Sequence, residues 1–160
     1  MKKDLKASSQ RIQDILHQKN IETNVIEFNQ LTRTAQEAAD TIGCAVAQIA
    51  KTLIFKGKKS GNAVCIIASG INTVDEKKIA AIIGEKIEKA DPTFVRANTG
   101  FAIGGIPPIG YTLNVKPLID EDLTQHTQIW AAAGTPQAVF NITPKHLLEL
   151  TNGVVADIKK

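Results

Sequence analysis

The apolar residues of the chain recur with two spacings, one typical of helices and one typical of strands. Ile12, Ile15 and Leu16 are three or four residues apart and share one face of a predicted helix. Shorter apolar runs between turn residues, such as AVCIIAS, predict strands. The predicted helices and helical turns span residues 11–18, 35–42, 46–51, 76–83, 92–99, 120–123 and 144–150. The predicted strands span residues 23–28, 52–56, 63–69, 111–115, 129–132 and 138–142.

Capping residues mark the ends of several predicted helices. Thr34 and Glu37 have the spacing of a capping box, in which hydroxyl and carboxylate bind backbone N–H groups at the helix start. Asp75 and Asp91 are predicted N-caps, and the second is followed by a proline at the first helical position. Gly43 supplies the stop for the helix that Thr34 begins.

Strands joined by short turns dominate the predicted order. Segments 52–56 and 63–69 flank the turn KGKKSGN as a hairpin, and 129–132 continues into 138–142 through Gly134. Parallel neighbours require crossovers of about a dozen residues or more, so these strands cannot all be parallel. We therefore expect an α/β fold of the mixed, α+β-like kind. It would have a central mixed, largely antiparallel sheet surrounded by helices, in a single domain over residues 1–160.

Composition narrows the class of protein. The 160 residues are 43% hydrophobic and 22% charged, which is typical of a globular domain that folds without a disulfide or a metal. Cys44 and Cys65 lack metal-ligand spacing, and we interpret them as small buried apolar residues. No apolar run of about 18 residues occurs, so a cytoplasmic location without membrane association is expected. A net charge of +3 does not identify a nucleic-acid-binding protein, but it is compatible with a local phosphate-binding face.

The segment TGFAIGGIPPIGY, from Thr99 to Tyr111, is too apolar for an ordinary exposed turn. It contains four glycines and two prolines. Gly104 and Gly105 can adopt backbone angles closed to other residues and can leave N–H groups uncovered, while the prolines fix the adjacent backbone. Such a loop can present amides to an ester carbonyl or a terminal ribose, although it has neither the P-loop nor the dinucleotide-binding order of glycines. A glycine-rich turn that only packs is the alternative interpretation.

Three segments together resemble the YbaK/ProX family. They are AKTLIF around Lys51, GFAIGGIPPIG with its Gly104-x-x-x-Pro108 core, and WAAAGTP at Trp130. The resemblance extends from Thr34 to the last predicted strand. Members of the family are free-standing aminoacyl-tRNA deacylases, similar to the editing insertion of bacterial prolyl-tRNA synthetases. The resemblance implies the fold of the editing insertion and an activity that removes amino acids wrongly attached to tRNA. It also implies action in trans, because 160 residues leave no room for a synthetase core.

The same resemblance implies roles for individual residues. Lys51, Gly104 and Gly105 would be catalytic, and the lysine would neutralise a phosphate or hold the acyl end of the substrate. The residues implied to bind the substrate are Phe28, Thr34, Ala35, Phe101, Ile103, Ile106, Pro107, Pro108 and Gly134. The expected partners are aminoacyl-tRNA, through its 3′-terminal adenosine and acyl group, and prolyl-tRNA synthetase. No cofactor and no metal are expected, and a surface lysine without function is the alternative for Lys51.

Sequence signatures of covalent or zinc-dependent hydrolysis are missing, since no GxSxG or HExxH motif occurs. His17, His126 and His146 are interpreted as satisfied or exposed histidines. We expect loop amides to polarise the ester carbonyl while a ribose hydroxyl, the substrate's own side chain or a positioned water attacks. Some relatives carry a histidine where this chain has Tyr111, and the residues around Gly134 also differ from those of cysteinyl-specific members. The amino acid removed therefore stays open among cysteine, alanine, serine, threonine and small non-protein amino acids.

Two interpretations from other classes remain open beside an editing hydrolase acting on tRNA for proline. A non-catalytic module could bind tRNA ends or a synthetase through the same loop, and it would bind charged tRNAs without hydrolysing them. A regulatory or structural protein could use the loop to dock a partner, and it would show no salt-dependent affinity for tRNA.

Overall fold

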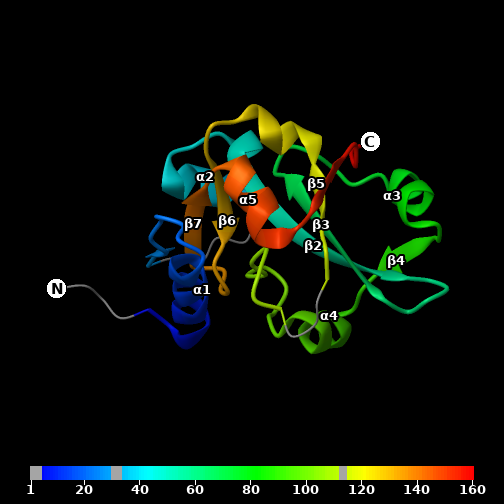
Figure 1. The fold of residues 1–160 in the computed structure, drawn as a ribbon, viewed down its shortest axis with the longest axis horizontal. Helices are drawn as coiled ribbons and strands as arrows, with labels where there is room; N and C mark the ends of the chain where they lie inside the picture. Colours follow the sequence, from blue (N-terminus) through cyan, green and yellow to red (C-terminus); the bar gives the residue numbers. More distant parts are fainter. Residues whose placement is uncertain (1–4, 30–33, 112–114) are drawn as a thin grey trace.

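The computed structural model describes residues 5–29, 34–111 and 115–160, and within these ranges it contains five α-helices, two 3₁₀ helices and eight strands (Figure 1). The helices are α1 Ala7–Gln18, α2 Ala35–Ile42, α3 Glu76–Ile83, α4 Pro92–Thr99 and α5 Pro144–Thr151, with the 3₁₀ helices η1 Val46–Gln48 and η2 Glu121–Gln125. The strands are β1 Ile26–Glu27, β2 Ile49–Gly57, β3 Ala63–Ser69, β4 Ile87–Lys89, β5 Leu118–Asp120, β6 Ile129–Ala132, β7 Ala138–Ile142 and β8 Val154–Ala156.

The described strands form one sheet in the order β1-β7-β6-β2-β3-β5-β8, with β4 paired to β2 beside this path. Four of the strand pairings are antiparallel and three are parallel. The predicted hairpin is confirmed, since β2 and β3 pair antiparallel along most of their length. The parallel pairing of β2 with β6 sets Ile49 beside Trp130, which brings distant parts of the chain together. The expectation of a mixed, largely antiparallel sheet is confirmed.

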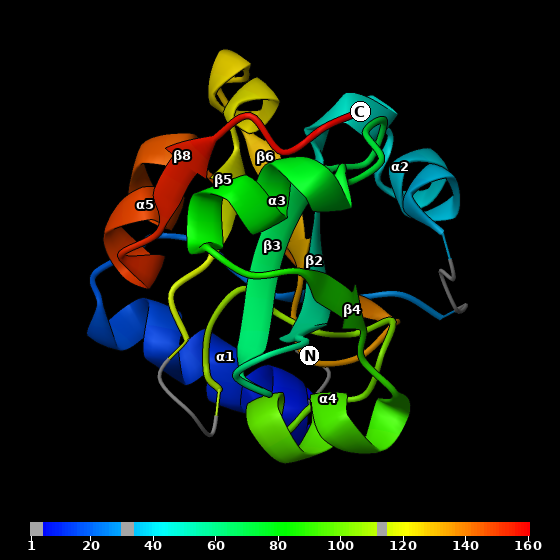
Figure 2. The ribbon, with the colours of Figure 1, turned by 90° about the vertical axis from the view of Figure 1, so that its right-hand side faces the viewer.

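The two faces of the sheet pack against different helices, because successive residues of a strand point to opposite faces. Ala50 and Ile54 of β2 and Ile67 of β3 belong to the largest core, which α1 and α5 complete. Ile66, next to Ile67 along β3, packs instead in a second core with α3. Figure 1 shows α1 and α3 on opposite sides of β2 and β3, and Figure 2 shows α3 in front of β3.

Local capping interactions place the helices where the sequence predicts them. Thr34 Oγ1 accepts a hydrogen bond from the Glu37 N–H at 3.1 Å, and Gly43 ends α2 with a φ of 87°. The side chains of Asp75 and Asp91 likewise accept N–H groups in the first turns of α3 and α4. The predictions for α2, α3 and α4 are confirmed, as are those for β6 and β7.

The beginning of the fold differs from its prediction. Helix α1 starts at Ala7, before the predicted start at residue 11. The prediction missed the first turn because its residues are small or polar and give no apolar periodicity. Of the segment predicted to be extended, only β1 pairs with another strand. The Gln13 side chain binds the Thr23 carbonyl at 3.0 Å and the Val25 N–H at 2.7 Å, so these backbone groups are satisfied without a neighbouring strand.

Three further boundaries require correction or fall outside the description. The helical turn predicted to reach Lys51 ends at Gln48, and Lys51 lies inside β2. The helix predicted to begin at Asp120 is the 3₁₀ helix η2, and Asp120 is the last residue of β5. The strand predicted over 111–115 includes residues 112–114, which lie outside the described ranges.

Candidate functional site

A cavity of about 600 Å³ lies where α2, three strands and the loop after α4 meet. Its size falls within the range of roughly 300–1,000 Å³ that is usual for small-ligand sites. The lining residues are Thr34, Ala35, Gln36, Ala38, Val46, Ile49, Ala50, Lys51, Thr52, Leu53, Gly70, Ile103, Gly104, Ile106, Trp130, Ala131, Ala132, Thr135, Pro136, Ala138 and Val139. The structure thus brings Lys51 and Gly104, which are far apart in the sequence, to one cavity.

Lys51 projects from β2 as a half-buried ammonium group. Within the described part of the chain, no hydrogen bond or ion pair reaches its Nζ atom. Burial lowers the pKa of Lys51 below the usual value of a lysine, and the negative charge of Asp120 opposes this shift in part. A charge that is partly removed from water and unpaired is a mark of a functional site rather than of a stabilising contact.

The remainder of the described lining carries no ionisable side chain. Alanine accounts for much of the wall, and the polar side chains are those of Thr34, Gln36, Thr52 and Thr135. Thr52 Oγ1 is buried without a hydrogen-bond partner among the described residues. It nevertheless affects the neighbouring Tyr111 hydroxyl, where it opposes part of the rise in the pKa of Tyr111. The cavity can therefore enclose a small apolar group next to a single positive charge.

The tip of the loop after α4 forms one rim of the cavity. Ala102, Ile103 and Gly104 are exposed, and the Ile103 side chain is 56% exposed. Gly104 has a φ of 99°, which favours glycine, and its N–H has no acceptor within the described ranges. A Cβ atom at Gly104 would lie 3.8 Å from Pro136 Cγ, so the tip sits against the turn between β6 and β7. The Gly104 amide is thus available to a ligand in the cavity.

Gly105 packs against the turn between β6 and β7, and the catalytic role expected of it stays a prediction. It does not line the cavity, and its N–H donates to the Ala102 carbonyl at 3.2 Å. A Cβ atom at Gly105 would meet three backbone atoms of Thr135, its C, Cα and N, at 2.6, 2.7 and 2.9 Å. The absence of a side chain therefore allows the loop to lie directly on the β6–β7 turn, and this contact sets the position of Gly104.

A hydrogen bond to the Pro107 carbonyl fixes the second half of the loop after α4. The Tyr111 hydroxyl donates to the Pro107 carbonyl at 2.6 Å and lies 3.5 Å from Cys65 Sγ in β3. Burial raises the pKa of Cys65 to about 12 and also raises the pKa of Tyr111, so both groups are neutral near pH 7. This neutral clamp joins the loop to the central hairpin.

Several residues that the sequence implied to bind substrate lie elsewhere. Phe101, Pro107 and Pro108 are buried and anchor the loop, and Phe101 packs in the main core. Phe28 borders a separate recess beside Thr41. Gly134 has a φ of 95°, and a Cβ atom there would approach the backbone of Ser8 to 3.1 Å, so it serves the contact between the β6–β7 turn and α1. The lining includes four of the expected binding residues: Thr34, Ala35, Ile103 and Ile106.

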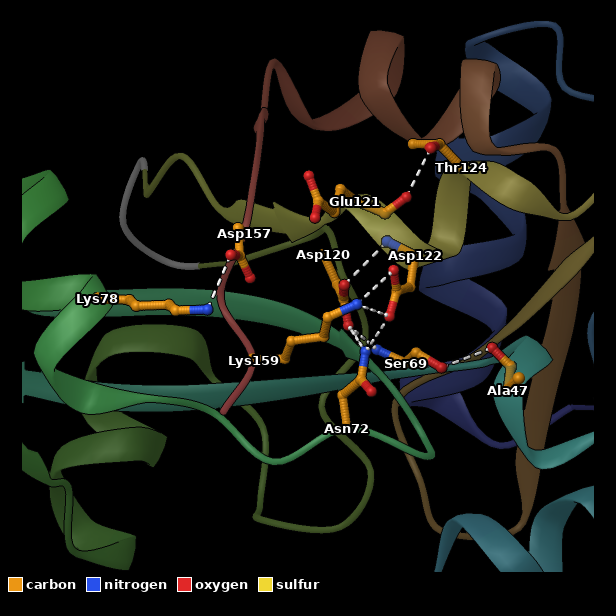
Figure 3. A network of polar contacts seen from close by, with 10 residues as sticks. All are labelled: Ala47, Ser69, Asn72, Lys78, Asp120, Glu121, Asp122, Thr124, Asp157 and Lys159. Carbon is orange, nitrogen blue, oxygen red and sulfur yellow. Dashed lines mark hydrogen bonds and ion pairs between the residues drawn. The ribbon is translucent and has the colours of Figure 1, made fainter.

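A polar network centred on Asp120 joins the end of β3 to β5 and η2 (Figure 3). The fully buried Asp120 carboxylate accepts hydrogen bonds from the Ser69 N–H at 2.9 Å and from the Asn72 side-chain amide at 2.7 Å. Ser69 Oγ donates to the Ala47 carbonyl at 2.8 Å, which joins the end of β3 to η1. These bonds fix the position of Gly70, the next residue, at the cavity wall.

The structure adds residues for which the sequence analysis proposed no site role. Gly70 lines the cavity, and a Cβ atom there would meet the Val46 carbonyl oxygen at 2.5 Å and Ala35 Cβ at 2.9 Å. Trp130 also lines it, and its place in the segment WAAAGTP was the available signal. The Gly70 contact gave no signal, because it depends on how α2 approaches the end of β3.

Two negative findings apply to the described residues. No group of three or more His, Cys, Asp or Glu side chains in these ranges is arranged to hold a metal ion. None of the helices within them has both the length and the apolar character needed to cross a membrane.

The chain is similar to known proteins in both sequence and fold. A model of the family described as "Aminoacyl-tRNA editing domain" matches residues 30–150. The uncharacterized protein YwhH of Bacillus subtilis (strain 168) is 33% identical over 132 residues, which are 82% of this chain and 83% of that protein. "Putative Cys-tRNA(Pro)/Cys-tRNA(Cys) deacylase EbsC" of Enterococcus faecalis (strain ATCC 700802 / V583) is 32% identical over 126 residues, 78% of this chain and 76% of its own.

A solved structure extends the similarity to almost the whole chain. It is titled "Crystal structure of a putative trans-editing enzyme for prolyl tRNA synthetase" and is 42% identical, with a TM-score of 0.92. The superposition covers 98% of this chain and 99% of that one, so the mixed sheet and its helices are shared. The matched family region contains Lys51, Gly104 and all of the described cavity lining. The chain therefore belongs to the aminoacyl-tRNA editing domain family.

Proposed function

We propose that this protein hydrolyses the ester bond between a small amino acid and the 3′-terminal adenosine of a mischarged tRNA, with tRNA for proline as the expected carrier. It would act in trans, as a single domain, and prolyl-tRNA synthetase is a candidate partner. The observation that carries the proposal is the unpaired, half-buried ammonium of Lys51 in an otherwise uncharged cavity, opposite the free amide of Gly104. The names of the similar proteins, which refer to deacylation and to trans-editing, support the same reaction.

The charge distribution suits an acylated nucleotide. A buried cation without a partner is unfavourable by itself, and a terminal phosphate or a developing oxyanion would compensate it. The Gly104 N–H, which has no acceptor among the described residues, could donate to the ester carbonyl as negative charge develops on the carbonyl oxygen. Lys51 would thus hold the substrate by charge, and Gly104 would polarise the bond that breaks.

The attacking group in this proposal comes from the substrate or from water. The described cavity lining contains no His, Asp, Glu or Cys that could act as a general base. A cavity that holds the ester rigidly can place a water close to the carbonyl carbon, and the neighbouring ribose hydroxyl can orient that water, since attack by the hydroxyl itself would only shift the acyl group to the other ribose oxygen. The water oxygen then bonds to the carbonyl carbon, and the ribose oxygen leaves with a proton from the water. The alanine-rich wall offers an apolar surface to a small acyl group, and selection among acyl groups by size is part of this proposal.

The test is release of amino acid from a panel of charged tRNAs. We expect measurable deacylation of tRNA for proline that carries alanine, serine, cysteine or threonine, and much slower deacylation when it carries leucine or phenylalanine. The rates would be measured by release of labelled amino acid under conditions in which the spontaneous hydrolysis of each ester is subtracted. Equal rates for small and large acyl groups would contradict the proposed selection by cavity size.

The lack of a general base in the described lining favours one second candidate, a module that binds tRNA ends without hydrolysing them. The same panel distinguishes the two functions. Tight, salt-dependent binding of charged tRNA together with unchanged ester lifetimes would select the binding module. Turnover of substrate in excess over protein would select the hydrolase.

The state of Lys51 gives a prediction that does not depend on catalysis. Burial lowers the pKa of Lys51 in the free protein, and a bound phosphate would favour the ammonium form and raise that pKa again. At pH values between the two pKa values, Lys51 is deprotonated in a larger fraction of the free protein than of the complex. We therefore expect binding of 5′-AMP to take up protons, measured by calorimetry in two buffers of different ionisation enthalpy. Lys51→Met should abolish the uptake, and equal enthalpies in both buffers for the unmodified protein would refute it.

A further inference from the structure

Trp130 is an aromatic surface within the cavity whose role the proposed reaction leaves open. It is the single tryptophan of the chain and the one aromatic side chain in the described lining. It packs against the small core of Ala38, Ala39 and Ile49, between α2 and β2, yet it is only partly buried. Part of the indole is therefore supported from behind, while another part borders the cavity.

The strand register places Trp130 in line with the catalytic groups. Trp130 of β6 pairs with Ile49 of β2 and shares its face of the sheet. Lys51 lies two residues further along β2 on the same face, roughly 7 Å away along the strand. Beyond it, the β6–β7 turn presents Pro136 beside Gly104. The order across the cavity is thus an aromatic surface, a cation and a free loop amide.

We propose that Trp130 is the stacking platform for the terminal base of the acylated nucleotide. This inference rests on the proposed function, since that function supplies a base, a ribose and an ester in the same linear order. A purine over the indole would set the ribose and phosphate near Lys51 and the ester toward Gly104. Flat bases stack on aromatic side chains, and the purines have the larger flat surface.

Two features of the surroundings suit a flat, largely uncharged ligand at this place. The apolar part of the described cavity lining is mostly alanine, valine and isoleucine, and the start of α2 adds Thr34 and Gln36, which could meet the polar edge of a base. Ile103 on the opposite rim exposes 56% of its surface, and a ligand in the cavity would cover part of it. A filler residue of the core would need neither an open cavity nor an exposed apolar rim.

The emission of Trp130 provides a direct test, because no other tryptophan contributes to the signal. Adenosine, which lacks the phosphate, is titrated into the unmodified protein with excitation at the red edge of the indole absorption. We expect saturable quenching, with a weaker response to uridine at equal concentration. Unchanged emission at adenosine concentrations that inhibit deacylation would overturn the proposal, because adenosine would then bind elsewhere.

Kinetics of two variants separate stacking from packing. Trp130→Leu keeps a smaller apolar side chain without a ring and is expected to raise KM by roughly 5–150-fold, as for loss of one stacked base, with a smaller change in kcat. Trp130→Phe should recover much of this loss, and Phe94→Leu, which lies on α4 outside the cavity lining, should change neither constant. A KM of Trp130→Leu equal to that of the unmodified protein, with circular dichroism showing a folded chain, would also overturn the proposal. If no charged tRNA is hydrolysed at all, the proposed function fails; saturable quenching by adenosine would then still support stacking on Trp130, and emission unchanged by adenosine would overturn it.

Discussion

Replacing Lys51 by alanine is expected to lower kcat/KM for deacylation by about 10²- to 10³-fold, the effect usual for loss of one group that stabilises developing charge. The reason is that the described cavity lining offers no second cation to take over its role. Lys51 makes no hydrogen bond or ion pair with other described residues, so its loss should leave the fold intact. The measurement is single-turnover release of amino acid from the best substrate of the charged-tRNA panel.

Matched variants separate the charge of Lys51 from the volume of its side chain. Lys51→Met keeps much of the apolar stem and removes the charge, and it should be as inactive as the alanine variant. Lys56→Ala removes a lysine from the same strand whose Nζ lies 5.2 Å from the centre of the Phe94 ring, outside the cavity, and it should retain activity. An unchanged rate for Lys51→Met would show that the ammonium is not needed, and the proposed mechanism would then be incorrect.

The parts of the fold that local chemistry determines could be predicted from the sequence. The boundaries of α2 follow from Thr34 at one end and Gly43 at the other, and both act within a single helix. The strands β4, β5 and β8 were not predicted because each has three residues, too few to show a period. Their pairing depends on distant partners, as when Leu118 of β5 lies between Ile66 and Val154. Short strands of this kind are determined by the tertiary structure rather than by their own residues.

The site could likewise be predicted only in part, because its residues come from separate elements that the tertiary structure brings together. The composition of the loop identified Gly104, and the family resemblance identified Lys51, while their common cavity required the three-dimensional fold. The catalytic role expected of Gly105 also came from the family resemblance. Its actual contact is with Thr135, which is thirty positions away in the sequence and adjacent only after β6 and β7 have paired. Predictions from residue type thus locate the loop but do not tell which of its glycines lines the cavity.

The packing of Gly105 leads to the second large expected effect, in the variant Gly105→Ala. The new methyl group would overlap the Thr135 backbone at 2.6–2.9 Å, and backbone atoms cannot turn aside as a flexible side chain can. The loop must therefore move away from the β6–β7 turn. Overpacking of this kind lowers the stability of the folded protein by about 1–3 kcal/mol. The same movement displaces the Gly104 amide, and a misplacement of about 1 Å can lower the rate by roughly 10²-fold.

The control for Gly105→Ala must lose similar stability far from the cavity. Gly84 ends α3 with a φ of 85° and has no atom within 4 Å of an added Cβ, so Gly84→Ala is strained only by its backbone angle, at a cost of about 1–3 kcal/mol. Thermal melts would show both variants destabilised, while deacylation below the melting transitions should fall only in Gly105→Ala. Equal activity of the two variants would mean that the contact between Gly105 and Thr135 does not position the Gly104 amide for the proposed reaction. The loop would then contribute to stability alone.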